Sequence, residues 1–93
     1  MAVLFCIPGP LRAFSSGLQQ VEIKTSPATV RDALDALYRE CPGIRDRLIN
    51  EEGQLREHIN IFVGDENIRQ TGYFSTAVPP GVEISIIPAV SGG

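Results

Sequence analysis

The stretch Ser26–Gly43, SPATVRDALDALYRECPG, decides which fold this sequence can adopt. Thr29 is the predicted N-cap of a helix, and Asp32 follows three residues later in a shortened capping box. Pro42-Gly43 ends the predicted helix. A helix with one apolar stripe must pack against an element that offers an apolar face. The stripe has the spacing of one helical face and consists of Val30, Ala33, Leu34, Leu37 and Cys41.

Segments on both sides of the helix alternate in the manner of strands and offer such faces. We predict strands over residues 2–8, 19–25, 59–63 and 82–87, and a short return strand over residues 67–69. The first two strands would form a hairpin with a long Gly/Pro/Ser-rich connection. The side chains predicted to face the core are Val3, Phe5, Ile7, Val21, Ile23, Ile59, Ile61, Val63, Val82, Ile84 and Ile86.

Two connections also have recognisable local patterns. Residues 44–48 favour a short turn of helix, and Pro80-Gly81 suits the two central positions of a type II turn before the last strand. The economical arrangement of all these elements is an α+β fold, with one mixed sheet packed on the single helix around one core. A length of 93 residues supports one such core. We therefore expect a single domain over residues 1–93, in which residues 89–93 form a projecting tail.

Composition excludes several classes of protein. The net charge is −3 and the seven arginines are interspersed with acidic residues, which argues against broad binding to nucleic acid. Pro8-Gly9-Pro10 interrupts the apolar start, so we interpret that start as a strand and not as a signal peptide. We expect a cytoplasmic protein without a membrane span. Cys6, Cys41 and His58 lack metal-ligand spacing, and we expect the thiols to be structural.

Sequence motifs of self-sufficient enzymes are missing. The chain contains no glycine-rich phosphate-binding motif, no nucleophile elbow and no HExxH pair of metal ligands. A cysteine–histidine pair would have to join a mid-strand or helix-end thiol to His58, which is a poor basis for a nucleophile. We therefore do not expect the chain to act as an enzyme alone.

The ending IIPAVSGG is the remaining unusual feature. Pro88 lacks an N–H group and would end the last strand, so that five residues project by roughly 17 Å. Gly92 and Gly93 lack Cβ atoms and could thread a narrow channel. A carboxylate becomes an acyl electrophile only after it gains a leaving group. Adenylation by ATP would supply one, and sulfur could then displace AMP to give a thiocarboxylate. An activating enzyme acting in trans would be needed.

Over essentially its whole length the sequence resembles the ubiquitin-like sulfur carriers of the MoaD/ThiS family. The resemblance is carried by TVRDALDAL (29–37), INIFVGDENIR (59–69) and above all the ending IIPAVSGG (86–93). It implies a β-grasp fold whose first and last strands are parallel neighbours in the sheet centre. It also implies that Gly93 carries the adenylate and then the thiocarboxylate, while Gly92 enters the partner's channel. Pro79-Pro80-Gly81 departs from the Asp-Gly-Asp-type turn of many relatives.

The resemblance implies partners rather than bound cofactors. ATP and a sulfur donor would be used through an E1-like adenylating enzyme of the MoeB/ThiF type, and a sulfur-accepting synthase would follow. Residues 7–14, IPGPLRAF, and residues 42–48, PGIRDRL, favour the carriers of cysteine biosynthesis. The small subunit of molybdopterin synthase is the second interpretation, and thiamin formation or tRNA thiolation are further destinations. A ubiquitin-like protein modifier and a non-catalytic interaction module remain as other classes.

Strand alternation also predicts a partner surface. If the helix covers the face of Phe5, Ile61 and Ile86, the alternate residues lie on the open face of the sheet. Several apolar residues on one open face often mark an interface. That face would carry Leu4, Cys6, Phe62 and Ile87. The predicted partner contacts are Leu4, Phe62 and Ile87 of this face, together with Val90 and Ser91 of the tail.

Overall fold

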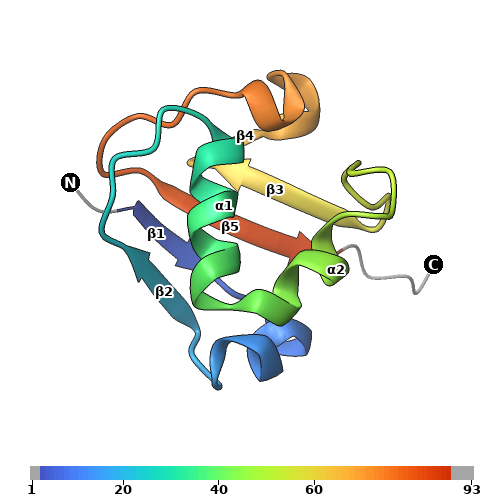
Figure 1. Ribbon diagram of the computed structural model, residues 1–93. Coiled ribbons are helices and arrows are strands. Elements are labelled where there is room, and N and C mark those ends of the chain that lie inside the picture. The colour runs from blue at the N-terminus through green and yellow to red at the C-terminus, as the bar shows by residue number, and fades with distance from the viewer. Residues whose placement is uncertain (1–2, 89–93) are drawn as a thin grey trace.

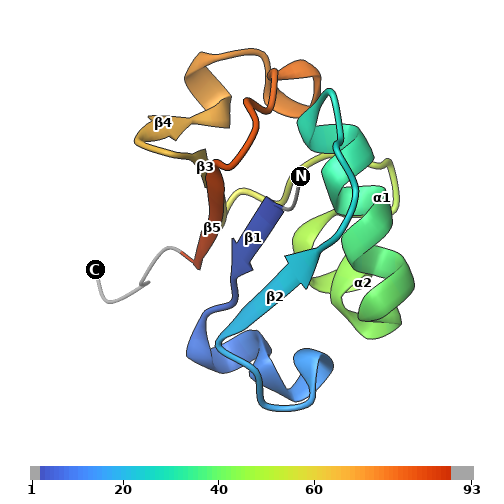
Figure 2. The same ribbon diagram turned by 90° about the vertical axis from the view of Figure 1, so that its left-hand side faces the viewer.

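The computed structural model of the chain describes residues 3–88. A five-stranded sheet lies against one main helix, α1 (Val30–Glu40), and the two layers are seen edge-on in Figure 2. The strands are β1 (Val3–Cys6), β2 (Gln20–Ile23), β3 (Ile59–Val63), β4 (Glu66–Asn67) and β5 (Glu83–Pro88). A shorter helix, α2 (Arg45–Leu48), and four 3-10 helices occupy the connections (Figure 1). The 3-10 helices are η1 (Gly9–Ser15), η2 (Pro42–Ile44), η3 (Ile68–Gln70) and η4 (Tyr73–Ser75).

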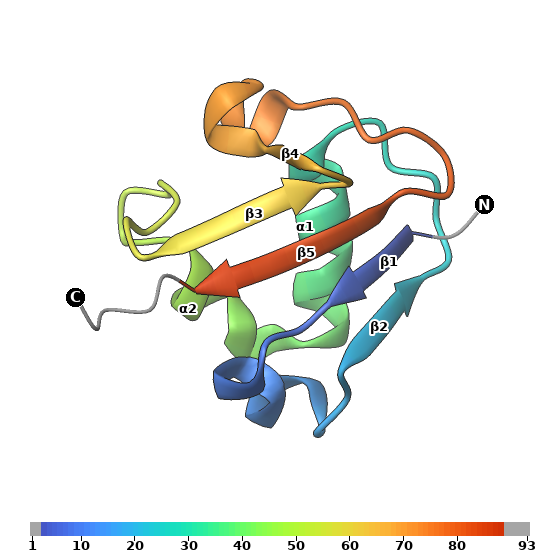
Figure 3. The same ribbon diagram turned by 180° about the vertical axis from the view of Figure 1, so that it is seen from behind.

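The strand order across the sheet is β2-β1-β5-β3-β4. β1 and β5 are parallel neighbours, whereas β1 pairs with β2, and β3 with both β4 and β5, in antiparallel fashion. The predicted mixed sheet on one helix is thus confirmed, as are the β1–β2 hairpin and the parallel central pair. Helix α1 lies across one face only, so the opposite face is open (Figure 3). No helix within residues 3–88 is long and apolar enough to cross a membrane.

Helix α1 forms where its pattern predicts it. The Thr29 hydroxyl accepts a hydrogen bond from the Asp32 backbone N–H at 3.4 Å, which caps the amino end. Four residues of the predicted apolar stripe are buried within α1, and the fifth, Cys41, is buried as the residue that ends the helix. The helix ends at Glu40 with Cys41 as its C-cap, because Pro42 has no N–H to continue the hydrogen-bond ladder.

The core collects the predicted inward-facing side chains of every strand, with one exception. Val82 is only half-buried and precedes β5, which begins at Glu83. The cause is the turn before the strand. The Val82 N–H donates to the Pro79 carbonyl at 3.3 Å, and Gly81 has φ +75°, as the third position of a type II turn requires. The predicted turn is therefore confirmed, and Val82 is its last residue.

The return strand predicted over residues 67–69 is shorter than expected. Pairing stops at Asn67, and the chain then enters η3. The Asn67 side-chain oxygen accepts a hydrogen bond from the Arg69 backbone N–H at 2.9 Å, which closes a local turn in competition with the ladder. This turn also carries Ile68 fully into the core, where it packs under the sheet edge.

Candidate functional site at the end of strand β5

Strand β5 ends at Pro88 in the middle of the sheet. Pro88 pairs with Ile59 of β3, and on its other side β5 is hydrogen-bonded to β1. β3 therefore flanks β5 up to the point where the chain leaves the sheet, whereas the pairing with β1 ends at Ser85. The predicted tail residues Val90, Ser91, Gly92 and Gly93 lie outside the described residues.

The register places the predicted partner residues on the open face in three rows. One row crosses the whole sheet as Gln20, Cys6, Ser85, Phe62 and Asn67. A second row, further from Pro88, joins Glu22, Leu4 and Glu83. The third row pairs Ile87 with Asn60 and lies beside the end of β5.

The apolar residues of the open face are interspersed with polar residues along these rows. Ser85 stands between Cys6 and Phe62, and Glu83 lies beside Leu4. Leu4, Cys6 and Phe62 are half-buried, whereas Ile87 is 47% exposed. Strand parity therefore identifies the face, while the register shows which polar residues lie directly beside its apolar ones. Ile87 is the most exposed of them and lies closest to Pro88.

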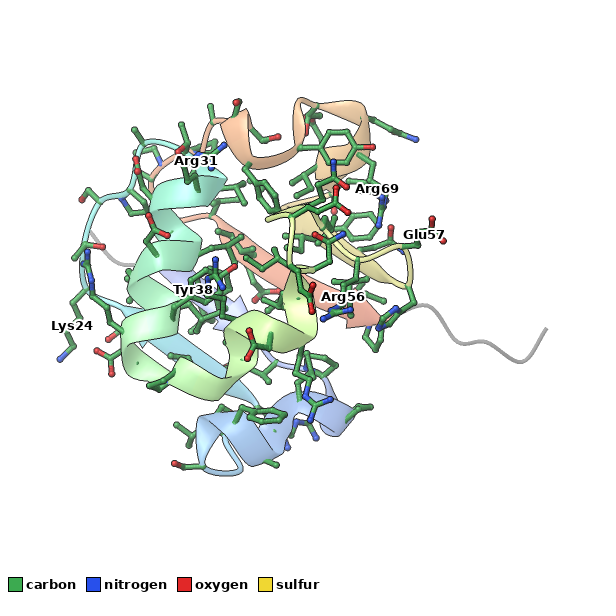
Figure 4. All side chains as sticks on the ribbon, turned by 45° about the vertical axis from the view of Figure 1, so that its right-hand side comes forward. Lys24, Arg31, Tyr38, Arg56, Glu57 and Arg69 are labelled. Atoms are coloured by element: carbon green, nitrogen blue, oxygen red, sulfur yellow. The ribbon has the colours of Figure 1, made fainter. Side chains whose placement is uncertain are left out.

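An arginine-centred network holds the strand beside this exit, and sequence reasoning missed it. The Arg69 guanidinium donates through Nη2 to the carbonyls of Arg56 and Ile59, at 2.7 Å each. Its Nε donates to the Asn60 side-chain oxygen at 3.1 Å, which the Asn67 amide also reaches at 3.3 Å. Figure 4 shows Arg69 and Arg56 on the side of the molecule where β5 ends. The network fixes the start of β3 against the turn that precedes it.

A hollow of about 420 Å³ lies on the other side of the exit. Pro88 and Ile59 line it together with the exposed side chains Arg47 and His58. The Arg47 guanidinium stacks on the ring of Phe14, 5.1 Å from the ring centre. Within the described part of the chain, no group of three or more metal-ligating side chains gathers at His58 or elsewhere. The hollow beside the exit is thus lined by apolar side chains together with Arg47 and His58.

Both thiols lie in surroundings that oppose ionisation. Burial, followed by the neighbouring Glu83 carboxylate, raises the pKa of the Cys6 thiol. Burial, followed by Glu40, raises the pKa of the Cys41 thiol. A thiolate is the nucleophilic form of cysteine, so neither side chain is activated for attack.

Comparison with known proteins identifies the family. The ThiS family model matches residues 6–93. The chain belongs to the ThiS family. It is 35% identical over 95 aligned residues to the sulfur carrier protein CysO of Mycobacterium tuberculosis, with both chains covered completely. It is also 38% identical over 66 residues to small archaeal modifier protein 1 of Haloferax volcanii, covering 71% of each chain.

Solved structures of similar proteins share the fold of this ThiS-family chain. A chain in the crystal structure of the Amycolatopsis orientalis BexX/CysO complex superposes with a TM-score of 0.88 at 38% identity, covering 98% of this chain and 99% of that one. The fold is therefore the β-grasp expected of ubiquitin-like sulfur carriers. The similar proteins named as sulfur carriers are small carrier proteins, and their names describe no catalyst.

Proposed function

We propose that this protein is a sulfur carrier whose Gly93 carboxylate is the working group. The observation that supports it most is the full-length similarity to a named sulfur carrier, combined with Gly92 and Gly93, which lie four and five residues beyond the end of β5. The Gly93 carboxylate attacks the α-phosphate of ATP, pyrophosphate leaves, and an acyl-adenylate forms. Sulfur at the sulfide level then displaces AMP and leaves a thiocarboxylate. Cysteine biosynthesis is the destination that the CysO likeness favours.

In this proposal residues 1–93 form one domain and residues 89–93 are its tail. The central position of β5 supports this, since the tail is anchored to a strand that is paired on both sides. The absence of Cβ atoms in Gly92 and Gly93 suits entry into a narrow channel of a partner. The tail is thereby presented to another protein, and the folded body sets its starting point.

The proposed docking surface consists of Leu4, Phe62 and Ile87 on the open face, with Val90 and Ser91 of the tail. An E1-like adenylating enzyme of the MoeB/ThiF type would bind this surface first, and a sulfur-accepting synthase would bind it afterwards. ATP and the sulfur donor are used through the activating enzyme. The exposed side chain of Ile87 beside the exit supports this choice of surface. A CysO chain has also been crystallised in complex with a second protein, BexX.

The decisive experiment is intact-mass spectrometry after incubation with ATP, sulfide and a purified activating enzyme. We expect one terminal oxygen to be replaced by sulfur, as seen from a mass increase equal to the difference between the two atoms. A variant lacking Gly93 should show no increase. If this shortened variant gains sulfur as readily as the complete chain, the proposal is wrong. Stable co-purification with a larger subunit would favour the molybdopterin synthase alternative.

A second candidate function is attachment to other proteins. It is favoured by the likeness to small archaeal modifier protein 1. In that case the activated Gly93 would form an isopeptide with a lysine of a target protein. Mass spectrometry of cell extracts would detect branched peptides ending in this tail, and a carrier that serves sulfur transfer alone would give none.

A further inference from the structure

The basic residues around the end of β5 share one chemical property. Arg69 donates to the carbonyl of Ile59, the residue paired with Pro88. Arg47 lines the hollow that Pro88 also lines. On the side of β1, Arg12 Nε donates to the Ile7 carbonyl at 3.1 Å. All three of these cations are arginines. The whole chain contains seven arginines and one lysine.

The single lysine lies at the far end of the sheet. Lys24 follows Ile23, which pairs with Val3, and the next residue of β1, Leu4, is level with Glu83 at the start of β5. Lys24 is therefore about seven residues and two strands away from Pro88, a separation of about 25 Å. Five extended residues span at most about 17 Å, and an extended lysine side chain adds about 6 Å, so that the two together fall short of this separation. Figure 4 shows Lys24 on the opposite side of the molecule from Arg56, Glu57 and Arg69.

We propose that the exclusion of lysine from the reach of the tail protects the activated carboxyl group from self-acylation. This inference rests on the proposed activation of Gly93. A neutral lysine Nζ near an acyl-adenylate would attack the carbonyl carbon, so that a C–N bond forms and the C–O bond to AMP breaks. AMP leaves and the nitrogen releases a proton to solvent. The product is an amide, which no longer accepts sulfur, and the carrier is lost.

Arginine keeps the positive charge without this reaction. Its guanidinium remains protonated under all ordinary conditions and has no free amine lone pair. At position 47 the contacts do not themselves demand arginine, because the side chain is exposed and a lysine would also stack on the ring of Phe14. The chemistry of the tail therefore explains why position 47 is arginine and not lysine, which packing alone leaves open. Arg47 and its arginine neighbours provide positive charge without offering an amine to the activated acyl group.

The test introduces lysine inside and outside this reach. The full chain is prepared as a C-terminal thioester, an electrophile that needs no activating enzyme, and is followed by intact mass. His58→Lys and Arg47→Lys should form a cyclic amide, lighter by one water than the free acid. At about 10 µM protein, an effective concentration in the millimolar range favours this internal attack about a hundredfold over attack between molecules. Cyclisation should also accelerate about tenfold per pH unit below the lysine pKa.

Two matched controls separate reach from charge. His58→Arg adds the same charge at the same position without a nucleophile, and Arg39→Lys adds an amine beside Lys24, far from Pro88. Both should behave like the unchanged chain, whose thioester hydrolyses without forming an amide. If His58→Lys and Arg47→Lys cyclise no faster than these controls, or if the unchanged chain cyclises on Lys24, the inference is wrong. Failure of ATP-dependent sulfur loading in the unchanged chain would instead count against the proposed function.

Discussion

Arg69 Nη2 lies 2.7 Å from the carbonyl oxygen of Ile59, the residue that pairs with Pro88 at the end of β5. One guanidinium thus joins the turn before β3 to the strand that flanks the tail. The same group also reaches the carbonyl of Arg56 and the side chain of Asn60. One side chain outside the strands therefore helps to hold the strand that pairs with the end of β5.

Loss of this guanidinium should destabilise the fold measurably. Arg69→Ala leaves three carbonyls, those of Arg56, Glu57 and Ile59, and the Asn60 oxygen without their charged donor. We therefore expect the free energy of unfolding to fall by about 2 kcal/mol. For a chain of this length that corresponds to a fall in Tm of roughly 10 °C, measurable by circular dichroism. The exposed neighbour Gln70 serves as the control, and Gln70→Ala should change stability by less than about 0.5 kcal/mol. Equal effects of the two substitutions would contradict this role of Arg69.

Gly81 should tolerate alanine poorly because of its backbone conformation and not because of crowding. Apart from its chain neighbours, an added Cβ at Gly81 meets no atom within 4 Å. Gly81 has φ +75°, and Gly81→Ala should cost about 1 kcal/mol because an L side chain strains that conformation. Gly81→Asn is the matched control and should cost less, since asparagine tolerates this position of a type II turn better than alanine does. Urea unfolding of both variants measures the difference, and an equal loss of stability in the two would refute the argument.

A charge at Ile87 should block activation without unfolding the protein. Ile87 is 47% exposed on the open face, so Ile87→Asp removes little buried surface. We expect the rate of its adenylation, measured as pyrophosphate release, to fall by at least about tenfold. This corresponds to a loss of about 1.4 kcal/mol in binding to the activating enzyme. Leu18 is exposed to a similar extent, 54%, but lies outside the open face. Leu18→Asp should adenylate normally, and a normal rate for Ile87→Asp would remove this residue from the docking surface.

The phenol of Tyr38 should make the fold sensitive to alkali. Burial, the largest effect, together with the nearby Asp35 raises its pKa to about 12, although Arg45 acts in the opposite direction. Between pH 10 and 12 the unfolded chain loses a proton that the folded chain keeps. Stability therefore falls as the pH rises through this window, by up to about 2 kcal/mol from this group.

Replacement of the phenol by a benzene ring isolates this contribution. Tyr38→Phe should flatten the decline in unfolding free energy between pH 10 and 12 that the unchanged chain shows. Denaturant titrations of both proteins across this window provide the measurement. The assignment fails if Tyr38→Phe and the unchanged chain show the same slope with pH.

The amphipathic patterns fixed most of the architecture in advance. The stripe of α1 and the alternation of β3 depend on residues close in sequence, and both packed as their periods predict. Strand alternation could also assign Ile87 to the open face. It could not show that Ser85 separates Cys6 from Phe62, because neighbouring strands were paired by inference and their register was unknown. The period of the apolar residues predicts which face of a helix or strand is buried. The register between neighbouring strands depends on contacts between distant segments, which the period does not predict.

The site around Pro88 is harder to predict from the sequence, because it also depends on contacts between distant segments. The sequence pattern places Arg69 in a strand, whereas its function in the fold depends on carbonyls ten to thirteen residues earlier. The signal available was Asn67 two residues before it, a pattern that favours a local turn over continued pairing. Likewise, Arg47 and Pro88 meet in one hollow although forty residues lie between them, and no local pattern joins them.

The parallel pairing of β1 with β5 has a mechanical consequence. A force along β5 draws this strand past β3 and, over residues 83–85, past β1 as well. The hydrogen bonds across such a ladder are loaded together in shear and do not open one after another. The folded body should therefore resist tension applied from its carboxyl end, so that a partner can pull on the tail while the body stays folded.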